Sequence, residues 1–276
     1  MKEPNERRKN VQLLPGIGAN VVQAEPATHA GTESELRSIG LIENPYCSLF
    51  RCNQFVLGPQ FAPGLENWTR VIAGPRLMLT AHPGLNVVQV ESGAKRLSAL
   101  GVLLDPNAPE DGDREILARL LDRFESLDAL IGACGPLGGR WTIVAVSGDE
   151  AHLFSDAFGL RQVFYAVPGA GEVFAMSEAA LGAKMLEIPV DSAAQAYIDT
   201  ELFRADPEYK WPATASAFCG IQRLLPTHSL DLRRGVSHRF WPGAPLRKLT
   251  LEEGAKRAGR LLRGLVRAAA NRFDWR

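Results

Sequence analysis

A chain of 276 residues is long enough to bury a sizeable core, and one or two domains are expected. Hydrophobic residues make up 46% of the chain and charged residues 22%, which is ordinary for a soluble globular protein. Because 31 basic residues balance 31 acidic residues, the formal net charge is zero, which argues against a nucleic-acid surface driven by bulk charge.

The N-terminus and the cysteines indicate no export, membrane insertion or metal. The N-terminus has no apolar core of signal-peptide length, and no apolar run approaches the ~20 residues needed to cross a bilayer. We therefore expect a cytoplasmic protein with reduced thiols, in which a net charge of zero leaves a homodimer possible. No C-x-x-C pair or zinc site is expected from the four cysteines, which are Cys47, Cys52, Cys134 and Cys219.

In chain order, residues 1–38 are rich in charge, Pro, Gly and Ala and predict a mobile extension. From 39 to 99, short apolar runs are broken by Pro and Gly, which favours strands and hairpins, for example over 55–59, 70–75 and 85–91. A buried strand is expected over 97–104, where Asp105-Pro106 ends it.

Two helical segments follow. Apolar residues fall at helical spacing between Asp113 and Phe124, and Asp113 is the predicted N-cap. A second helical segment is expected to begin near Leu127 and to end at Gly132 and Gly135.

The next four strands are predicted to form one antiparallel meander, over 141–146, 151–155, 163–167 and 172–175. A short helix capped by Ser177 should follow, and then a helix over 190–202. Short strands, hairpins and grouped helices indicate the α+β class.

The last predicted element is an amphipathic helix. Thr250 and Glu253 form a capping-box pair, and the helix that they open carries one broad apolar face. A basic helix of this kind can bind membranes, but more often its apolar face packs on a partner domain. The apolar positions are Ala255, Ala258, Leu261, Leu262, Leu265, Val266 and Ala269.

An ordered set of motifs carries a resemblance to a known family. Gly138-Gly139-Arg140-Trp141 opens a strand, a turn contains Asp156, Gly159 and Arg161, and Phe174-Ala175-Met176-Ser177-Glu178 follows. The closing segment is Ile221-Gln222-Arg223-Leu224-Leu225-Pro226-Thr227-His228, with Thr227 where a Gly is usual. Together these motifs resemble the N-terminal, class II glutamine amidotransferase domain of the asparagine synthetase-like family.

The resemblance implies a fold and a division of the chain. The fold is the four-layer αββα sandwich of N-terminal-nucleophile hydrolases, with antiparallel sheets packed between helices. The implied parts are the extension 1–38, an amidotransferase-like domain over 39–245, and residues 246–276 as the first helix of a truncated or absent synthetase domain.

The same resemblance implies that the chemistry is missing. The family uses an N-terminal Cys as nucleophile, with its own α-amino group as base. Lys2 follows Met1 here, so removal of Met1 exposes no Cys, and Cys47 or Cys52 would need a cleavage. No catalytic residue is therefore assigned.

The glutamine pocket is also reduced. The family's Asn-Gly-Glu run matches Leu100-Gly101-Val102, so only Gly101 survives. An amide offered apolar side chains would lose ~1–3 kcal/mol for each unpaired group. Asp113 matches an acid that could hold an amino group, although the role of helix cap is favoured for it. The vestigial pocket residues are thus Gly101 and Asp113.

The turn residues are expected to be structural. An ion pair between Asp156 and Arg161 would fix the hairpin around Gly159, and Glu178 would cap a helix near an interdomain face.

The favoured function is a non-hydrolytic scaffold module of an ATP-dependent, amide-forming protein. No cofactor is expected in this chain, since ATP and Mg belong to the synthetase domain expected to dock on helix 251–270. Two alternatives stay open: an active glutaminase or asparagine-synthase fragment after processing, and a stand-alone binding module that docks a separate synthetase chain. No nucleic acid, membrane or metal partner is expected.

Overall fold

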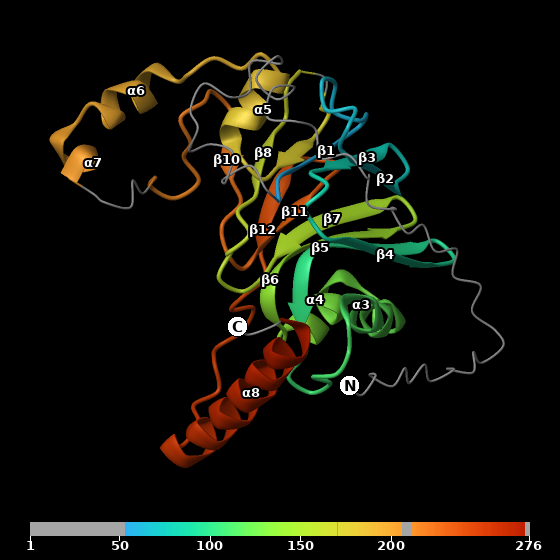
Figure 1. The fold of residues 1–276 in the computed structure, drawn as a ribbon. Coiled ribbons are helices and arrows are strands. Elements are labelled where there is room, and N and C mark those ends of the chain that lie inside the picture. The colour runs from blue at the N-terminus through green and yellow to red at the C-terminus, as the bar shows by residue number, and fades with distance from the viewer. Residues whose placement is uncertain (1–52, 170, 206–210, 274–276) are drawn as a thin grey trace, which may run out of the picture.

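The computed structural model of the protein describes residues 53–169, 171–205 and 211–273 (Figure 1). The predicted extension 1–38 and the first part of the predicted domain, 39–52, lie outside the described residues.

Two six-stranded sheets form the body of the structure, and every pair of neighbouring strands is antiparallel. The first sheet has the order β10-β8-β9-β1-β3-β2 and the second β12-β11-β7-β6-β5-β4. The first consists of β1 (Phe55–Gly58), β2 (Thr69–Gly74), β3 (Leu77–Ala81), β8 (Phe164–Ala166), β9 (Phe174–Met176) and β10 (Gln222–Arg223). The second consists of β4 (Val87–Ser92), β5 (Lys95–Leu104), β6 (Gly138–Ser147), β7 (Glu150–Ser155), β11 (His228–Asp231) and β12 (Val236–Arg239).

The sheets pack face to face, and helices cover their outer faces. On β6, Val144 and Val146 face the core between the sheets, whereas Ile143 and Ala145 face α3 (Asp113–Asp122) and α4 (Leu127–Cys134). Successive strand residues point to opposite faces, so a strand covered on both sides is apolar throughout. On the first sheet, α5 (Ala179–Met185) packs against the outer face.

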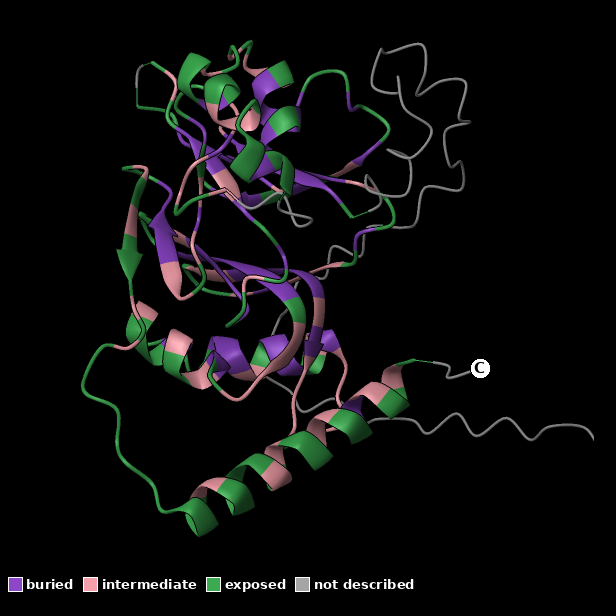
Figure 2. Cartoon of the chain, turned by 90° about the vertical axis from the view of Figure 1, so that its left-hand side faces the viewer, coloured by how far each residue is buried: buried purple, intermediate pink, exposed green. Residues whose placement is uncertain are grey.

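The remaining helices lie away from this core. They are α6 (Ser192–Ile198), α7 (Glu201–Ala205) and α8 (Leu251–Arg272). Figure 2 shows buried residues concentrated in the sheets and in α3 to α5, whereas most of α8 is exposed. The predicted helix over 190–202 is wrong in its extent, because α6 ends at Ile198 and α7 begins at Glu201.

The predicted single meander is also wrong. Strands β6 and β7 pair in the second sheet, but β8 and β9 belong to the first. The turn from Asp156 to Arg161 carries the chain from one sheet to the other, and residues 224–227 carry it back. Alternation of apolar and polar residues identifies a strand and its buried face, but it holds no information about which sheet the strand joins.

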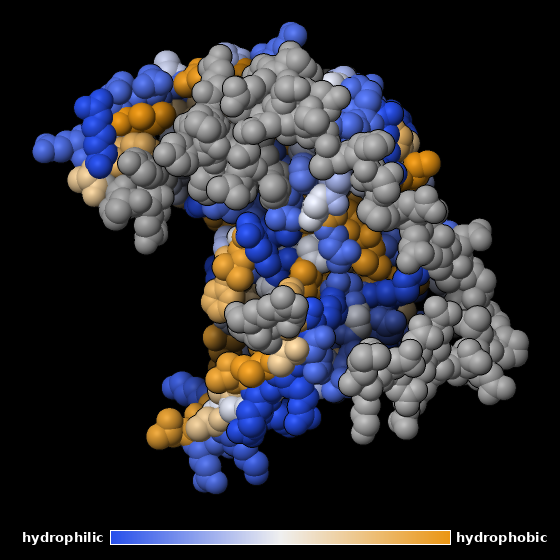
Figure 3. Space-filling view, in the orientation of Figure 1, coloured by the Kyte–Doolittle hydropathy of each residue, from blue (hydrophilic) through white to orange (hydrophobic). Residues whose placement is uncertain are grey.

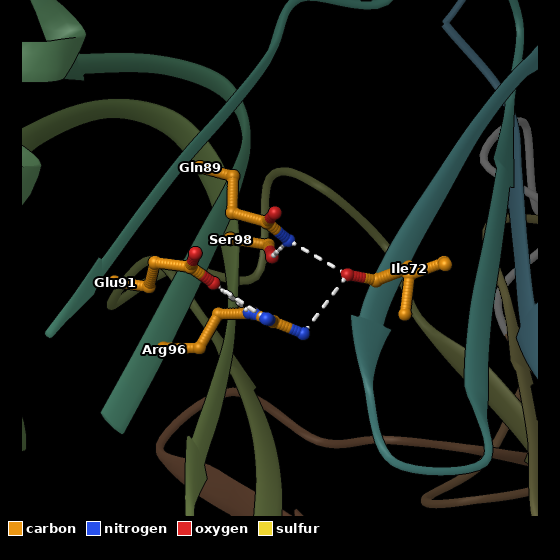
Figure 4. Close-up of polar contacts among 5 residues, drawn as sticks. All are labelled: Ile72, Gln89, Glu91, Arg96 and Ser98. Atoms are coloured by element: carbon orange, nitrogen blue, oxygen red, sulfur yellow. Dashed lines mark hydrogen bonds and ion pairs between the residues drawn. The ribbon is translucent and has the colours of Figure 1, made fainter. Parts of the chain in front are cut away.

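The two sheets are also linked by polar contacts at their edges (Figure 4). A β-bulge between Ile72 and Gly74 interrupts the pairing of β2 with β3. The carbonyl of Ile72 accepts hydrogen bonds from Gln89 Nε2 at 3.1 Å and from Arg96 Nη1 at 3.3 Å. Glu91 holds the same guanidinium through Arg96 Nε at 2.8 Å. Side chains of the second sheet thus satisfy a backbone group of the first.

Thr227 lies in the return crossing with a φ of 62°. A left-handed backbone is strained for a β-branched residue and natural for Gly, which the resemblance places at this position. His228 next to it contacts the carbonyl of Pro226 through Nδ1 at 2.9 Å, within the same turn.

We predict that Thr227→Gly raises the free energy of unfolding by about 1 kcal/mol, because it removes this strain. Urea unfolding followed by circular dichroism measures the change. Thr69→Gly is the matched control: Thr69 lies in β2, outside the left-handed region, so its replacement should lower stability. Equal losses of stability in both variants would contradict the strain at Thr227.

Candidate functional site

The site begins at the N-terminal end of β1. Asn53, which follows Cys52 in the sequence, has a φ of 86°, and its carbonyl accepts a hydrogen bond from Arg161 Nη1 at 3.0 Å. The next residue, Gln54, donates from Nε2 to the carboxylate of Glu178. Two of the motif residues therefore meet the start of β1, more than 100 positions earlier in the chain.

The turn that delivers Arg161 is held by Asp156. Its buried carboxylate accepts backbone hydrogen bonds from Phe158 at 3.2 Å, Leu160 at 3.0 Å and Arg161 at 3.2 Å. Gly159 supplies a φ of 61° at the centre of the turn. The expected side-chain ion pair between Asp156 and Arg161 is not formed, because the carboxylate binds backbone N–H groups and the guanidinium reaches across to Asn53.

Arg161 lies directly over the backbone of Gly101 in β5. Gly101 has a φ of 104°, and a Cβ built there would overlap the carbonyl of Arg140 and lie 2.9 Å from Arg161 Nη2. Only Gly fits this position, since any side chain would meet both strain and overlap. The absence of a side chain at Gly101 thus leaves the space that the guanidinium of Arg161 occupies.

The guanidinium of Arg161 is buried without a hydrogen-bonded carboxylate. The residue is 6% exposed, and its Nε has no hydrogen-bond partner. Desolvation, together with the positive charge of Arg140, lowers the pKa of Arg161 to about 10, and the negative charge of Asp156 only partly opposes these effects.

Asp113 is not the helix cap that the sequence suggests. The N-cap of α3 is Gly112, and Asp113 is the first helical residue. Its Oδ1 accepts from the backbone N–H of Leu103 at 2.7 Å, and its Oδ2 accepts from Asn86 Nδ2 at 2.8 Å. Its carboxylate also forms an ion pair with Arg272 of α8. Three donors therefore saturate a buried acid that the sequence analysis placed in the vestigial pocket.

Asn86 joins this acid to the rest of the site. Its Nδ2 also donates to the carbonyl of Gly101 at 3.0 Å, so that Asp113, Asn86 and Gly101 form one chain of contacts. We call the continuous set Asn53, Asn86, Gly101, Asp113 and Arg161 the polar seam. Sequence reasoning missed Asn86 and Arg272, since neither stands in a recognisable motif, although Asn86 directly precedes the β4 strand.

Of the two residues expected to cap a helix near the site, Glu178 stands at the N-cap position and Ser177 does not. Ser177 does not cap α5, since its Oγ accepts from the backbone N–H of Phe55 at 2.9 Å and thereby joins β1. Glu178 occupies the N-cap position of α5 without a side-chain capping bond, because its carboxylate binds Gln54. Both side chains thus form hydrogen bonds with residues at the start of β1.

One end of α8 docks beside the seam. The predicted capping box of Thr250 and Glu253 is confirmed at its start. Near its end, Asn271 Nδ2 donates to the backbone carbonyl of Pro109 and Arg272 Nη1 to that of Asp111, both at 3.1 Å. Ala268 is only 2% exposed. The beginning of α8 projects from the body, with hydrophobic and hydrophilic surface side by side (Figure 3).

Part of the predicted apolar face of α8 remains uncovered. Leu262 is 63% exposed and Val266 61%, and Ala255 and Ala258 are also exposed. Leu265 packs close to Gly138, and Leu261 is half-buried. The face is thus divided into a docked stripe and an exposed stripe.

Within residues 53–169, 171–205 and 211–273, no group of His, Cys, Asp and Glu residues could hold a metal ion. In the same residues, no helix has the length and apolar character to span a membrane. Cys134 and Cys219 are free thiols, and burial raises the pKa of Cys134 to about 12. Cys47 and Cys52 lie outside the described residues.

No protein-family model matches the chain, and no curated protein matches it. Among solved structures, it is similar to the glutamine phosphoribosylpyrophosphate amidotransferase from B. subtilis, solved in complex with ADP and GMP. The identity is 12% and the TM-score 0.42, over 70% of this chain and 44% of that chain. This chain therefore spans less than half of that protein. Similarity at this level does not establish a function.

We predict that Asp113→Ala lowers the free energy of unfolding by about 2–3 kcal/mol, because it leaves the buried Leu103 N–H unpaired and Arg272 without its acid. Hydrogen exchange should also quicken at the end of α8. Asp122→Ala, an exposed acid on the same helix, is the control and should change stability by less than about 0.5 kcal/mol. Equal effects of the two variants would show that the contacts of Asp113 carry little energy.

Proposed function

We propose that the chain is a non-hydrolytic, amidotransferase-like domain of an asparagine synthetase-like, amide-forming protein. Residues 39–245 would form the domain, and residues 246–276 would belong to the first helix of a synthetase domain. In this proposal the domain does not release ammonia from glutamine, and it supports the ATP-using partner. We place it in the cytoplasm, where the free thiols of Cys134 and Cys219 would stay reduced.

The observation that carries the proposal is the contact between Arg272 and Asp113. Asp113 matches the acid that would hold the amino group of glutamine, and here a guanidinium of the same chain satisfies it. A ligand ammonium would have to displace Arg272 together with the end of α8, which two further hydrogen bonds hold in place. The cost of that displacement disfavours glutamine binding.

Arg161 supports the same conclusion at the other end of the polar seam. Its guanidinium occupies the space over Gly101 that the matching amide pocket would need. The neighbouring Leu100 is fully buried in the core between the sheets, so it offers a ligand no polar group. In this proposal, the guanidinium groups of Arg272 and Arg161 occupy the positions that match the glutamine pocket.

The layering is consistent with the proposal. In space the order is α5, the first sheet, the second sheet, and then α3 with α4. We therefore propose that the fold is a four-layer αββα sandwich of the N-terminal-nucleophile type. ATP and Mg would bind to the synthetase partner and not to this chain.

We predict that the purified full chain releases neither glutamate nor ammonia from glutamine above the level without protein, because Asp113 and the space over Gly101 are occupied. Coupled assays for both products, with an authentic glutaminase as positive control, measure this. Intact mass, recorded on the same sample, reports whether the N-terminus has been cut.

One observation favours the alternative, an amidotransferase activated by processing. Strand β1 begins three residues after Cys52, and the polar seam meets Asn53 directly. A cleavage before Cys52 would place an N-terminal thiol at the start of β1, where a nucleophile is expected. Turnover that accompanies a new N-terminal Cys52, and that Cys52→Ala abolishes, would overturn the non-hydrolytic proposal.

We further propose that the exposed stripe of α8, formed by Ala255, Ala258, Leu262 and Val266, is covered by the synthetase domain. The docked end of α8 fixes the helix on this chain, while its projecting part offers apolar side chains to another surface. Whether that domain lies on the same polypeptide or on a separate chain does not change the contact.

We predict that a synthetase domain of the asparagine synthetase-like kind, added as a separate protein, slows amide exchange over 251–266. Leu262→Glu with Val266→Glu should weaken binding by at least ~10-fold, since the double variant puts charge into an apolar contact. Arg260→Glu with Arg267→Glu, both exposed on the opposite face, is the control. A concentration-dependent homodimer that protects the same amides, seen by light scattering, would assign the stripe to a second copy instead.

A further inference from the structure

A cavity of about 340 Å³ opens at the end of the two sheets opposite to the polar seam. The seam meets the start of β1, whereas Pro59, just after the end of β1, lines the cavity. Turns from both sheets surround the opening: the β2–β3 turn of the first sheet, and the β6–β7 and β11–β12 turns of the second. The volume lies within the range of roughly 300–1,000 Å³ that small-molecule sites occupy.

The floor of the cavity is the edge of the core between the sheets. Five of its lining side chains are buried members of that core, and all five are apolar: Leu77, Val146, Ala151, Val173 and Leu232. Each of these five residues is at most 7% exposed, so only the outermost atoms of the core line the floor. Such a floor favours the apolar part of a small ligand, because its side chains provide apolar contact area and no hydrogen-bonding groups.

The rim carries charge. Arg76 and Arg233 stand on turns of opposite sheets, and Asp149, Glu150 and Glu172 complete the rim. Arg233 already donates to the carbonyl of Asp149 at 3.0 Å. Arg76 makes no hydrogen bond or ion pair with any residue that the structure describes, so its guanidinium is available to a ligand.

The backbone of Arg76 lies in the left-handed region, which is strained for an arginine. Pro75 precedes Arg76 in the tight β2–β3 turn, and Arg76 has a φ of 60°. Turns of this form favour Gly or Asn at that position, since a larger side chain crowds the left-handed backbone. An arginine here works against the local preference of the turn, which points to a use for the side chain.

We propose that this cavity binds a small amphipathic carboxylate. The apolar body of the ligand lies against Leu77, Val146 and Leu232, and its carboxylate pairs with Arg76 at the rim. The acids Asp149, Glu150 and Glu172 repel a carboxylate from their side of the opening, which orients the ligand toward Arg76. The site is independent of the proposed function, because it shares no residue with the polar seam.

Isothermal titration calorimetry of the full chain with hexanoate, hexanol and hexylamine tests the proposal. Hexanoate should bind with measurable heat, and the neutral and cationic analogues should bind at least ~10-fold more weakly. In a methyl-labelled sample, hexanoate should shift the signals of Leu77, Val146 and Leu232. No saturable heat with hexanoate, or equal affinity for hexanol or hexylamine, would overturn the proposal.

Two variants separate binding from folding. Arg76→Gly and Arg76→Asn both suit the left-handed turn, so their melting temperatures without ligand should equal or exceed that of the parent chain. Both should bind hexanoate at least ~10-fold more weakly. Arg70→Gln, which removes an arginine of the same hairpin that does not line the cavity, should bind like the parent. Unchanged affinity in the Arg76 variants would exclude a role for this guanidinium.

Discussion

The burial of the two inner sheet faces against each other is the constraint on which the rest of the structure depends. Side chains from both sheets form one core, including Leu57 and Leu79 from the first sheet and Leu153 and Leu230 from the second, all fully buried. Because strands of each sheet come from distant parts of the chain, the connecting turns must cross between layers. The Asp156 turn is one of these crossings, and three backbone N–H groups bound to one carboxylate hold its shape. The positions of Arg161 and of the polar seam follow from that crossing.

The polar seam shows how side chains of the protein satisfy its buried polar groups. Buried carboxylates and backbone carbonyls need donors, and here the chain itself supplies them. Asp113 obtains them from Leu103, Asn86 and Arg272, and the carbonyl of Asn53 obtains one from Arg161. Arg161 Nε has no hydrogen-bond partner, and burial lowers the pKa of Arg161, so this half of the seam is less completely satisfied than the half around Asp113.

Local sequence patterns predicted the elements of this fold better than their assembly. The strands around Phe55, Val87 and Leu97 and the helix that begins at Asp113 lie where periodicity placed them. The single meander, the cap role of Asp113 and the ion pair within the Asp156 turn were wrong. In each of these cases the structure adds a contact between distant parts of the chain: β9 with β1, Asp113 with Arg272, and Arg161 with Asn53. The energy of a buried polar group depends on all donors near it in space, and local sequence does not record them.

The sequence by itself determined the apolar alternation of the strands, the glycine at 101, the capping box of α8 and the zero net charge, because each is a property of neighbouring residues or of composition. Only the tertiary structure decided that Arg272 meets Asp113, that Arg161 lies over Gly101, and that a cavity with Arg76 at its rim opens at the far end of the sheets. These contacts join residues that are far apart along the chain, so they exist only after both sheets have formed and closed on their common core.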